Sequence, residues 1–358
     1  MTDANAANVG PTTTINPMQT QGFSFLEFTA SKNPEHFTTT FTNLGFSKIA
    51  VHARKDVELW KQGNIHFLVN RDSNSASQKF SDQHGPCTSA MGFRVKDASF
   101  AFERAVELGA EVFTGEGVID VPAIYGIGGS VLYFVSEDYD LESEFEIIAG
   151  VDMNSTNMGL VELDHVTHNV LRGNMDKWAG FYEKLFNFRE IRYFDIEGKL
   201  TGLKSRAMTS PCGKIRIPIN ESSDDKSQIE EFINEFNGEG IQHIALTSSN
   251  IYKSVENIRS NGVTFLDTPD TYYEGIAKRV PWHSESVEDL HKNKILIDGA
   301  PTADGGLLLQ IFTDTVIGPA FFEIIQRKGD EGFGEGNFQA LFDSIELDQV
   351  RRGVLKDE

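Results

Sequence analysis

The chain has 358 residues, more than one ordinary hydrophobic core holds, so its length predicts two domains of about 150 residues each. Acidic side chains outnumber basic ones by 53 to 32, which gives a net charge of −21. This charge repels phosphate backbones and anionic membrane surfaces, so it argues against nucleic acids and membranes as partners. An anionic substrate would need a local positive charge, which a bound divalent cation could supply.

The first residues and the cysteines indicate the compartment. Residues 1–21 are rich in Thr, Asn and Ala and have neither a basic start nor an apolar core. We therefore expect a disordered tail there, and neither a signal peptide nor a membrane anchor. Cys87 and Cys212 lack the spacing of a metal site or a disulfide framework. Two free thiols suit a reducing compartment, so a cytoplasmic protein is predicted.

From Gly22 onward, short β-rich runs alternate with helical patterns. The run GFSFLEFTA precedes the helical pattern NPEHFTTTFTNL and three more strand-like runs, SKIAVHA, VELWKQ and IHFLVN. This order is a βαβββ unit. The strand-then-helix pattern returns at TSAMGFRV, LDHVTHNV and IQHIALTS, with helices expected over 98–108, 175–186 and 251–261. The sequence therefore predicts an α+β fold of four modules paired into two lobes, over 22–151 and 160–358, with a linker near 152–159.

Two internal similarities support a duplication. Setting Gly109 against Gly262 aligns the second and fourth modules and pairs Ala90 with His243. The tetrapeptide FEII occurs at 145–148 and again at 322–325, which pairs Glu146 with Glu323. The first lobe would then keep a carboxylate, but its first strands carry no histidine. We expect the second lobe to hold a metal site and the first to act as a scaffold.

The candidate metal ligands are His165, His243 and Glu323. Two histidines on strands and a glutamate on a later strand form a facial site, which leaves three positions of an octahedral iron for substrate and O2. His165 and His168 point to opposite sides of their strand, so only one of them can bind this metal. The residues alone leave that choice nearly even. For any one of these histidines, the alternative is a hydrogen-bonded residue of the core.

Other polar side chains on strands have weaker claims. Gln310 and Phe312 share a face of LLLQIFTD, so a polar anchor and an aromatic wall could line one pocket. Asn220 shares a face with Pro218 and Arg216 in KIRIPINE. For either amide, a hydrogen bond across the sheet is an equally good interpretation. The remaining histidines have no partner in the repeat, so surface or structural roles are expected for His36, His52, His66, His84, His283 and His291.

Near the C-terminus, a Gly-rich hinge leads into an amphipathic helix. We expect the helix in GDEGFGEGNFQALF to begin near Asn337, a residue type typical of an N-cap, with Phe333 and Phe338 on either side of it. Glycines permit both the turn and motion, so this helix could close over the site. The alternative is a helix docked permanently on the core.

Several motifs together resemble the bacterial 4-hydroxyphenylpyruvate dioxygenases. They are LDHVTHNV, FYEKLFNFREIRYFDI, GEGIQHIA, DTYYE, LLLQIF, GPAFFEIIQRKGDEGFGEGNFQALFDSIE and DQVRRGVL, and the resemblance covers Gly22 to Leu355. It implies the vicinal oxygen chelate fold, with four βαβββ modules in two open barrels, the iron in the second barrel and a C-terminal gating helix. It also implies a homodimer or homotetramer that assembles through the N-terminal domain.

The resemblance implies an activity and a set of residues. 4-Hydroxyphenylpyruvate and O2 would give homogentisate and CO2 in tyrosine catabolism, through oxidative decarboxylation, ring hydroxylation and side-chain migration. One Fe(II) per subunit would be held by His165, His243 and Glu323, which decides the choice against His168. Gln242 is a weaker candidate, because strand parity turns it away from the face of His243. The implied substrate pocket consists of Ser205, Asn220, Gln228, Gln310, Phe312, Phe333 and Phe338.

Two rival functions share this fold. 4-Hydroxymandelate synthase resembles the same family and uses the same substrate and iron, but it oxidises the benzylic carbon. Phe338 argues against it, since a smaller aliphatic residue stands there in that relative. A non-catalytic binding module is the other rival, and the complete ligand set argues against it. The ligand types alone would also accept Zn, Mn or Co.

Overall fold

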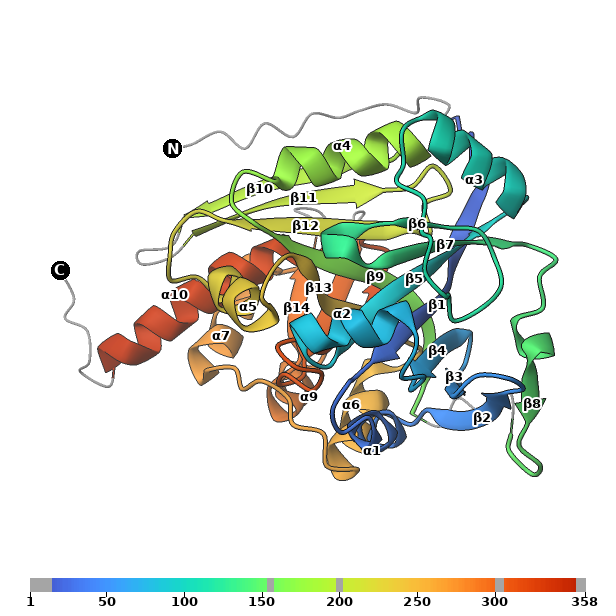
Figure 1. Cartoon of the computed structure of the whole chain (residues 1–358). Coiled ribbons are helices and arrows are strands. Elements are labelled where there is room, and N and C mark those ends of the chain that lie inside the picture. Colours follow the sequence, from blue (N-terminus) through green and yellow to red (C-terminus); the bar gives the residue numbers. More distant parts are fainter. Residues whose placement is uncertain (1–14, 153–157, 198–201, 300–305, 352–358) are drawn as a thin grey trace.

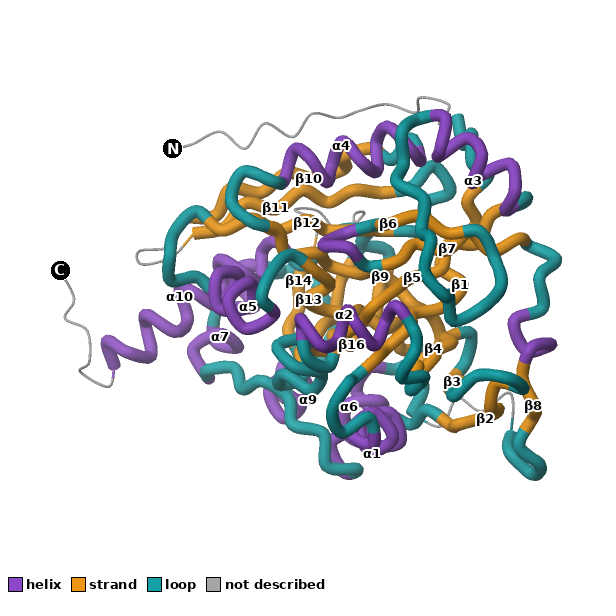
Figure 2. The backbone as a smooth tube through the Cα atoms, in the orientation of Figure 1, coloured by secondary structure: helices purple, strands orange, loops and turns teal. Residues whose placement is uncertain are grey.

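The computed structural model describes residues 15–152, 158–197, 202–299 and 306–351, which form two curled eight-stranded sheets (Figures 1 and 2). The first sheet has the order β6-β7-β5-β1-β4-β3-β2-β8, and the second has the order β10-β11-β12-β9-β13-β16-β15-β14. Strands of the first sheet are β1 (Thr20–Thr29), β2 (Ser47–His52), β3 (Val57–Gln62), β4 (Ile65–Asn70), β5 (Cys87–Val95), β6 (Ala123–Tyr125), β7 (Val131–Ser136) and β8 (Phe145–Ile147). Strands of the second are β9 (Leu160–Val170), β10 (Arg189–Glu197), β11 (Gly202–Thr209), β12 (Arg216–Ser222), β13 (Gly240–Ser248), β14 (Leu296–Gly299), β15 (Leu307–Phe312) and β16 (Phe321–Lys328).

Helices follow the first strand of every module, as the sequence predicts. These are α1 (Glu35–Asn43), α3 (Ala98–Glu107), α4 (Met175–Phe186) and α6 (Ile251–Ser260), each within two residues of its expected bounds. The α+β fold of paired βαβββ modules is therefore confirmed. The short helices were not predicted; they are α2 (Ala76–His84), α5 (Gln228–Phe236), α7 (Asp270–Glu274), α8 (Ile276–Arg279) and α9 (Val287–Asn293).

The helix α4 shows how local sequence sets an element that covers the second sheet. Its buried residues follow helical spacing, so one apolar face packs on the strands β11 and β12 below it (Figure 1). Asn187 ends the helix in the left-handed conformation, with φ of 58°, a conformation that Asn tolerates better than most residues do. The buried face consists of Met175, Trp178, Ala179, Tyr182, Leu185 and Phe186.

One aromatic core joins the two lobes and fixes the strand that carries Glu323. Phe322, its neighbour on β16, is fully buried on the opposite face of the strand. The Phe322 ring lies 6.0 Å from Phe67 and 6.5 Å from Phe41, both of the N-terminal lobe. Burial of one such ring contributes about 1.5–3 kcal/mol. The N-terminal lobe therefore supports the back of the strand whose front carries the carboxylate.

The strand pairings test the proposed duplication. In the first sheet Ala90 pairs with Val131 of β7, and in the second His243 pairs with Phe321 of β16. The strands β5 and β13 are equivalent, because each pairs with one antiparallel and one parallel neighbour. Ala90 and His243 therefore occupy corresponding positions in the two sheets. The match of Glu146 with Glu323 is wrong, because β8 pairs with β2 at the far edge of the first sheet.

The true counterparts of the triad in the first lobe are apolar or aromatic. By the same pairings, His165 corresponds to Phe25 and Glu323 corresponds to Tyr133. The rings of Phe25 and Tyr133 pack at 5.5 Å, in the place where the second lobe has its polar cluster. The first lobe thus has packed rings of a hydrophobic cluster where the second lobe has its triad.

The ends of the chain differ from expectation in two places. The first strand begins at Thr20 and Met18 is buried, so ordered structure starts inside the segment 1–21 that we expected to be a tail. Residues 1–14 lie outside the described residues. The C-terminal helix α10 (Glu335–Arg351) begins before Asn337, which is buried inside its first turn and is therefore not the N-cap.

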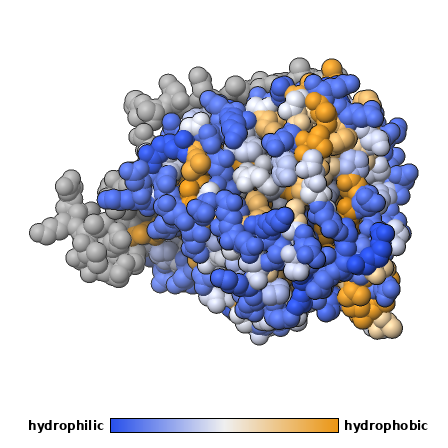
Figure 3. Space-filling view, in the orientation of Figure 1, coloured by the Kyte–Doolittle hydropathy of each residue, from blue (hydrophilic) through white to orange (hydrophobic). Residues whose placement is uncertain are grey.

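Polar residues dominate the face of the molecule drawn in Figure 3, with an apolar group at its lower right, where Figure 1 places β2 and β8. On these two strands Val51 is 39% exposed and Ile147 is 50% exposed. Within the described part of the chain, no helix combines the length and the apolar character needed to cross a membrane.

Candidate metal centre

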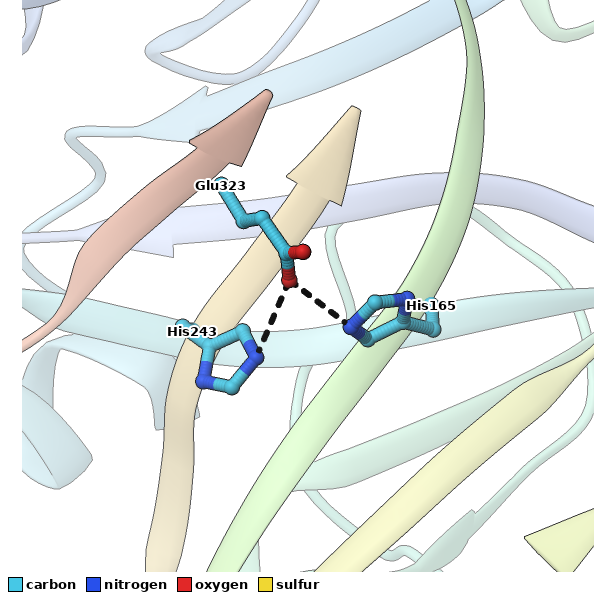
Figure 4. A group of neighbouring side chains, drawn as sticks. All are labelled: His165, His243 and Glu323. Carbon is cyan, nitrogen blue, oxygen red and sulfur yellow. Dashed lines mark ion pairs between the residues drawn. The ribbon is translucent and has the colours of Figure 1, made fainter. Parts of the chain in front are cut away.

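Three side chains from neighbouring strands converge inside the second sheet (Figure 4). His165 comes from β9, His243 from β13 and Glu323 from β16, and these strands lie side by side in the sheet. The Glu323 Oε2 atom lies 3.1 Å from His165 Nε2 and 3.5 Å from His243 Nε2. The three potential ligand atoms all lie within 4.8 Å of one another. Two imidazoles and one carboxylate in this arrangement form the donor set of a facial site for a divalent metal.

A β-bulge precedes each histidine of the cluster. The pairing of β9 with β13 skips Asp164 on one strand and Gln242 on the other. A bulge turns the extra side chain toward its neighbour, and His165 Nδ1 donates to Asp164 Oδ1 at 2.8 Å. His243 Nδ1 likewise donates to Gln242 Oε1 at 2.9 Å. The expectation that parity separates Gln242 from His243 is therefore wrong, because simple alternation fails at a bulge.

Both ring nitrogens of each histidine thus have defined roles. In the neutral imidazole, a hydrogen bond donated by Nδ1 leaves Nε2 without a proton, and an unprotonated Nε2 is the form that binds a metal. Asp164 is a charged partner and Gln242 a neutral one, so the two imidazoles differ in basicity.

Burial and the charges of the cluster shift the pKa values of its three members in different directions. Burial alone would raise the pKa of Glu323, but the two histidines lower it to about 2. Burial opposes the charged form of His165, yet Glu323 and Asp164 together raise its pKa. Burial lowers the pKa of His243. Glu323 is therefore an anion at neutral pH, as a metal ligand must be.

His168 lies on the other face of β9, as strand parity predicts. It is fully buried, and its Nε2 hydrogen-bonds to the Tyr182 hydroxyl of α4 at 2.7 Å. Burial lowers the pKa of His168 to about 3, so it stays neutral. This histidine is a core residue, and the geometry brings His165 to Glu323 instead.

Gln310 occupies the space beside Glu323. Its Nε2 donates to Glu323 Oε1 at 3.1 Å, and its Oε1 accepts from Asn337 Nδ2 of α10 at 3.0 Å. The hydrogen bond across the sheet, one of the two interpretations of Gln310, is therefore present. Gly334 has φ of +79°, and a Cβ there would lie 1.7 Å from Gln310 Oε1. Only glycine lets the hinge approach so closely.

Aromatic rings flank the cluster on two sides. The Phe333 ring centroid lies 5.3 Å from that of His165, and Phe312 lies 6.4 Å from His243. Phe321, which was not among the predicted aromatic residues, stacks on His243 with ring centroids 5.0 Å apart. These apolar walls limit the access of water to the cluster.

Ser205 and Asn220 form a polar row further along the sheet. Ser205 of β11 pairs with Asn220 of β12, which pairs with Asn169 of β9. Paired residues share a face, and Asn169 lies four residues after His165, so this row faces the interior of the barrel. Asn169 is fully buried, and among the described residues both of its amide atoms lack a partner. Asn169 was not among the predicted pocket residues, although it has the same strand parity as His165.

The structure does not bring every expected pocket residue to the cluster. Gln228 is exposed in the first turn of α5, and Phe338 is 37% exposed on α10. The segment 329–336 also lines a groove of about 700 Å³, together with Arg192 and Arg216. Phe333 lies outside the lining of this groove and faces His165.

Comparisons with known proteins show the family of the chain. The family model "Hydroxyphenylpyruvate dioxygenase, HPPD, N-terminal" matches residues 14–153, and that of the "Glyoxalase/Bleomycin resistance protein/Dioxygenase superfamily" matches 162–297. Hemolysin VllY of Vibrio vulnificus is 58% identical over 96% of this chain and 99% of its own length. The 4-hydroxyphenylpyruvate dioxygenase of Pseudomonas aeruginosa is 56% identical over 95% of this chain and 97% of its own. The chain belongs to the 4-hydroxyphenylpyruvate dioxygenase family.

Membership of this family and the two sheets together confirm the vicinal oxygen chelate fold. A solved triple mutant of 4-hydroxymandelate synthase from Streptomyces coelicolor is similar to the chain with a TM-score of 0.78 at 25% identity. It covers 92% of this chain and 99% of its own. The synthase shares the fold, but its identity is less than half that of the Pseudomonas dioxygenase, so it is the less supported rival.

Proposed function

We propose that the chain is a 4-hydroxyphenylpyruvate dioxygenase whose Fe(II) is held by His165, His243 and Glu323. The activity follows from the family, and the convergence of three ligand atoms inside the second sheet is the observation that supports the site. When bound there, Fe(II) supplies the binding of a 2-oxo acid and the activation of O2. 4-Hydroxyphenylpyruvate and O2 would then give homogentisate and CO2 in tyrosine catabolism.

The side chains around the cluster would orient and shield the reaction. Gln310 fixes Glu323 Oε1 and leaves Oε2 toward the histidines. Phe312 and Phe333 exclude water, which would otherwise compete with the substrate and quench a reactive species. We assign the phenol end of the substrate to the polar row of Ser205, Asn220 and Asn169.

The distance between the metal cluster and the polar row supports this assignment. Asn169 lies four residues from His165, a span of about 13 Å along a strand. A substrate chelated at the metal through its oxo-acid end would extend its ring along the barrel toward that row. The buried and unpaired amide of Asn169 would gain a hydrogen-bond partner from a phenol hydroxyl. Gln228 and Phe338 would have to move to take part, since both are exposed here.

We also propose a cytoplasmic homo-oligomer that assembles through the N-terminal lobe. Both cysteines are free thiols, in keeping with a reducing compartment. Exposed Val51 and Ile147 on β2 and β8, at one edge of the first sheet, support an interface on this lobe. Light scattering of the wild type and of Ile147→Lys would test the assembly.

The decisive experiment is reconstitution with Fe(II) without oxygen, followed by 4-hydroxyphenylpyruvate and O2. Homogentisate with an equal amount of CO2 is the expected result. 4-Hydroxymandelate as the product would move the chain to the synthase reaction, and binding without turnover would make it a binding module. Reconstitution with Zn(II) or Mn(II) instead is expected to give no product, and activity with either would refute the choice of iron.

A further inference from the structure

A largely buried arginine stands behind the candidate ligand His165. Arg327 lies on β16, four residues after Glu323, and 11% of its side chain is exposed. Its Nε and Nη2 atoms donate to the two oxygens of Asp164, each at 2.8 Å. A carboxylate bound at both oxygens by one guanidinium has a fixed orientation. Asp164 therefore presents Oδ1 to His165 Nδ1 in one geometry.

The same arginine also holds the Gly-rich segment 329–334. Its Nη1 donates to the backbone oxygens of Asp330 at 3.0 Å and Gly332 at 2.6 Å. The guanidinium lies 5.7 Å from the Phe333 ring, which in turn packs on His165. One side chain thus fixes both the carboxylate behind His165 and the turn that places Phe333 against it.

A second arginine repeats this connection. Arg216 of β12 lies 3.5 Å from Asp164 Oδ2 and also pairs with Glu331 of the same segment. Within the described ranges His243 has no equivalent charged link, since its Nδ1 partner is the neutral amide of Gln242. The charged link to the Gly-rich segment therefore belongs to one histidine of the cluster.

We propose that Arg327 and Asp164 are positioning residues that couple metal binding at His165 to closure of the Gly-rich segment. The inference rests on the proposed function only in taking His165 as a ligand. Opening the segment would remove two carbonyl acceptors and Phe333 from Arg327, and Asp164 would lose part of its fixed geometry. Because coupling is reciprocal, a bound metal must then also favour the closed segment.

The test measures Co(II) affinity and hydrogen exchange in the full-length chain. We expect Arg327→Lys and Asp164→Asn to weaken Co(II) binding by about 10–100-fold, the usual effect of losing an outer partner of a ligand. In the wild type, saturating Co(II) should slow amide exchange over 329–336. In both variants, saturating Co(II) should leave that exchange unchanged. If Arg327 and Asp164 served only stability, saturating Co(II) would still slow amide exchange in this segment in both variants.

Two further variants serve as controls for the coupling experiment. Lys328→Met removes a cation from the same strand that pairs instead with Glu285 at 2.6 Å, so it should behave as the wild type does. The double change Asp164→Asn and Arg327→Met removes both members of the buried ion pair, so neither is left as an unpaired charge. Like the single variants, it should bind Co(II) more weakly, and saturating Co(II) should not slow its amide exchange over 329–336.

Wild-type affinity in both single variants, with exchange still slowed by Co(II), would overturn the coupling. Failure of the proposed function gives a different pattern, in which the wild type binds Co(II) and couples normally but makes no homogentisate when loaded with Fe(II).

Discussion

Replacing the two histidines of β9 one at a time separates metal binding from stability. His165→Ala removes an imidazole whose Nε2 lies 3.1 Å from Glu323 Oε2, so we expect this variant to lose its bound iron and all oxygen consumption. His168→Ala removes a ring on the other face of the strand, so we expect its iron content to stay close to that of the wild type.

The cost of His168→Ala can be worked out from its contacts. The change leaves the buried Tyr182 hydroxyl without its partner, which costs about 1–3 kcal/mol. Losing the ring also leaves a cavity, which costs about 2 kcal/mol more. Part of this is offset, because His168 Nδ1 already lacks a partner among the described residues. We expect the free energy of unfolding to fall by about 2–4 kcal/mol.

The assay combines urea unfolding of the metal-free chain with iron content after anaerobic reconstitution. Tyr182→Phe is the matched control, since it breaks the same hydrogen bond without a large cavity and should lower stability by about 1–3 kcal/mol with normal iron content. Loss of iron in His168→Ala together with full iron in His165→Ala would refute the assignment of the ligand.

Three other predictions concern pH, the core and the pocket. Burial holds the pKa of His168 at about 3 in the folded chain against an ordinary 6.5, so the unfolded chain binds more protons between these values. The free energy of unfolding should therefore fall as pH drops below 6.5. Urea titrations at several pH values should show that His168→Gln makes this fall less steep by about 1.4 kcal/mol per pH unit. Phe322→Ala should cost about 3–5 kcal/mol in thermal or urea unfolding, because the ring joins the two lobes, and a loss below about 1 kcal/mol would contradict this role. Asn169→Val should raise KM for 4-hydroxyphenylpyruvate about tenfold through a lost phenol contact without lowering the unfolding midpoint, and an unchanged KM would remove Asn169 from the pocket.

Local pattern was enough to place the long elements. The four module helices and the strands that carry His165, His243 and Glu323 lie where periodicity predicts them, because alternation and helical spacing reflect which faces are buried. The helices α7, α8 and α9 escaped prediction because segments of four to seven residues leave little periodic signal. The helix α5 buries Ile229, Phe232, Ile233 and Phe236 at helical spacing, so its pattern could have been found in the sequence.

Local pattern failed wherever the outcome depended on a distant strand. FEII occurs twice, yet β8 pairs with β2 and β16 pairs with β13, so Glu146 has no relation to Glu323. Identical tetrapeptides can pair with different strands, because pairing is decided by the whole sheet. Bulges at Asp164 and Gln242 also reversed the expected direction of a side chain, and a bulge is defined by the strand opposite.

The sequence by itself therefore determined the modules, the acidic character and the three candidate ligands, with family resemblance choosing His165 over His168. Tertiary structure decided which side chains support those ligands. Asp164, Asn169 and Arg327 lie inside motifs that carry the family resemblance, but those motifs do not show which side chains the three residues contact. Their roles arise from contacts such as that between Arg327 and Asp164, 163 residues apart in the chain, and only folding brings such groups together where burial makes their partners matter.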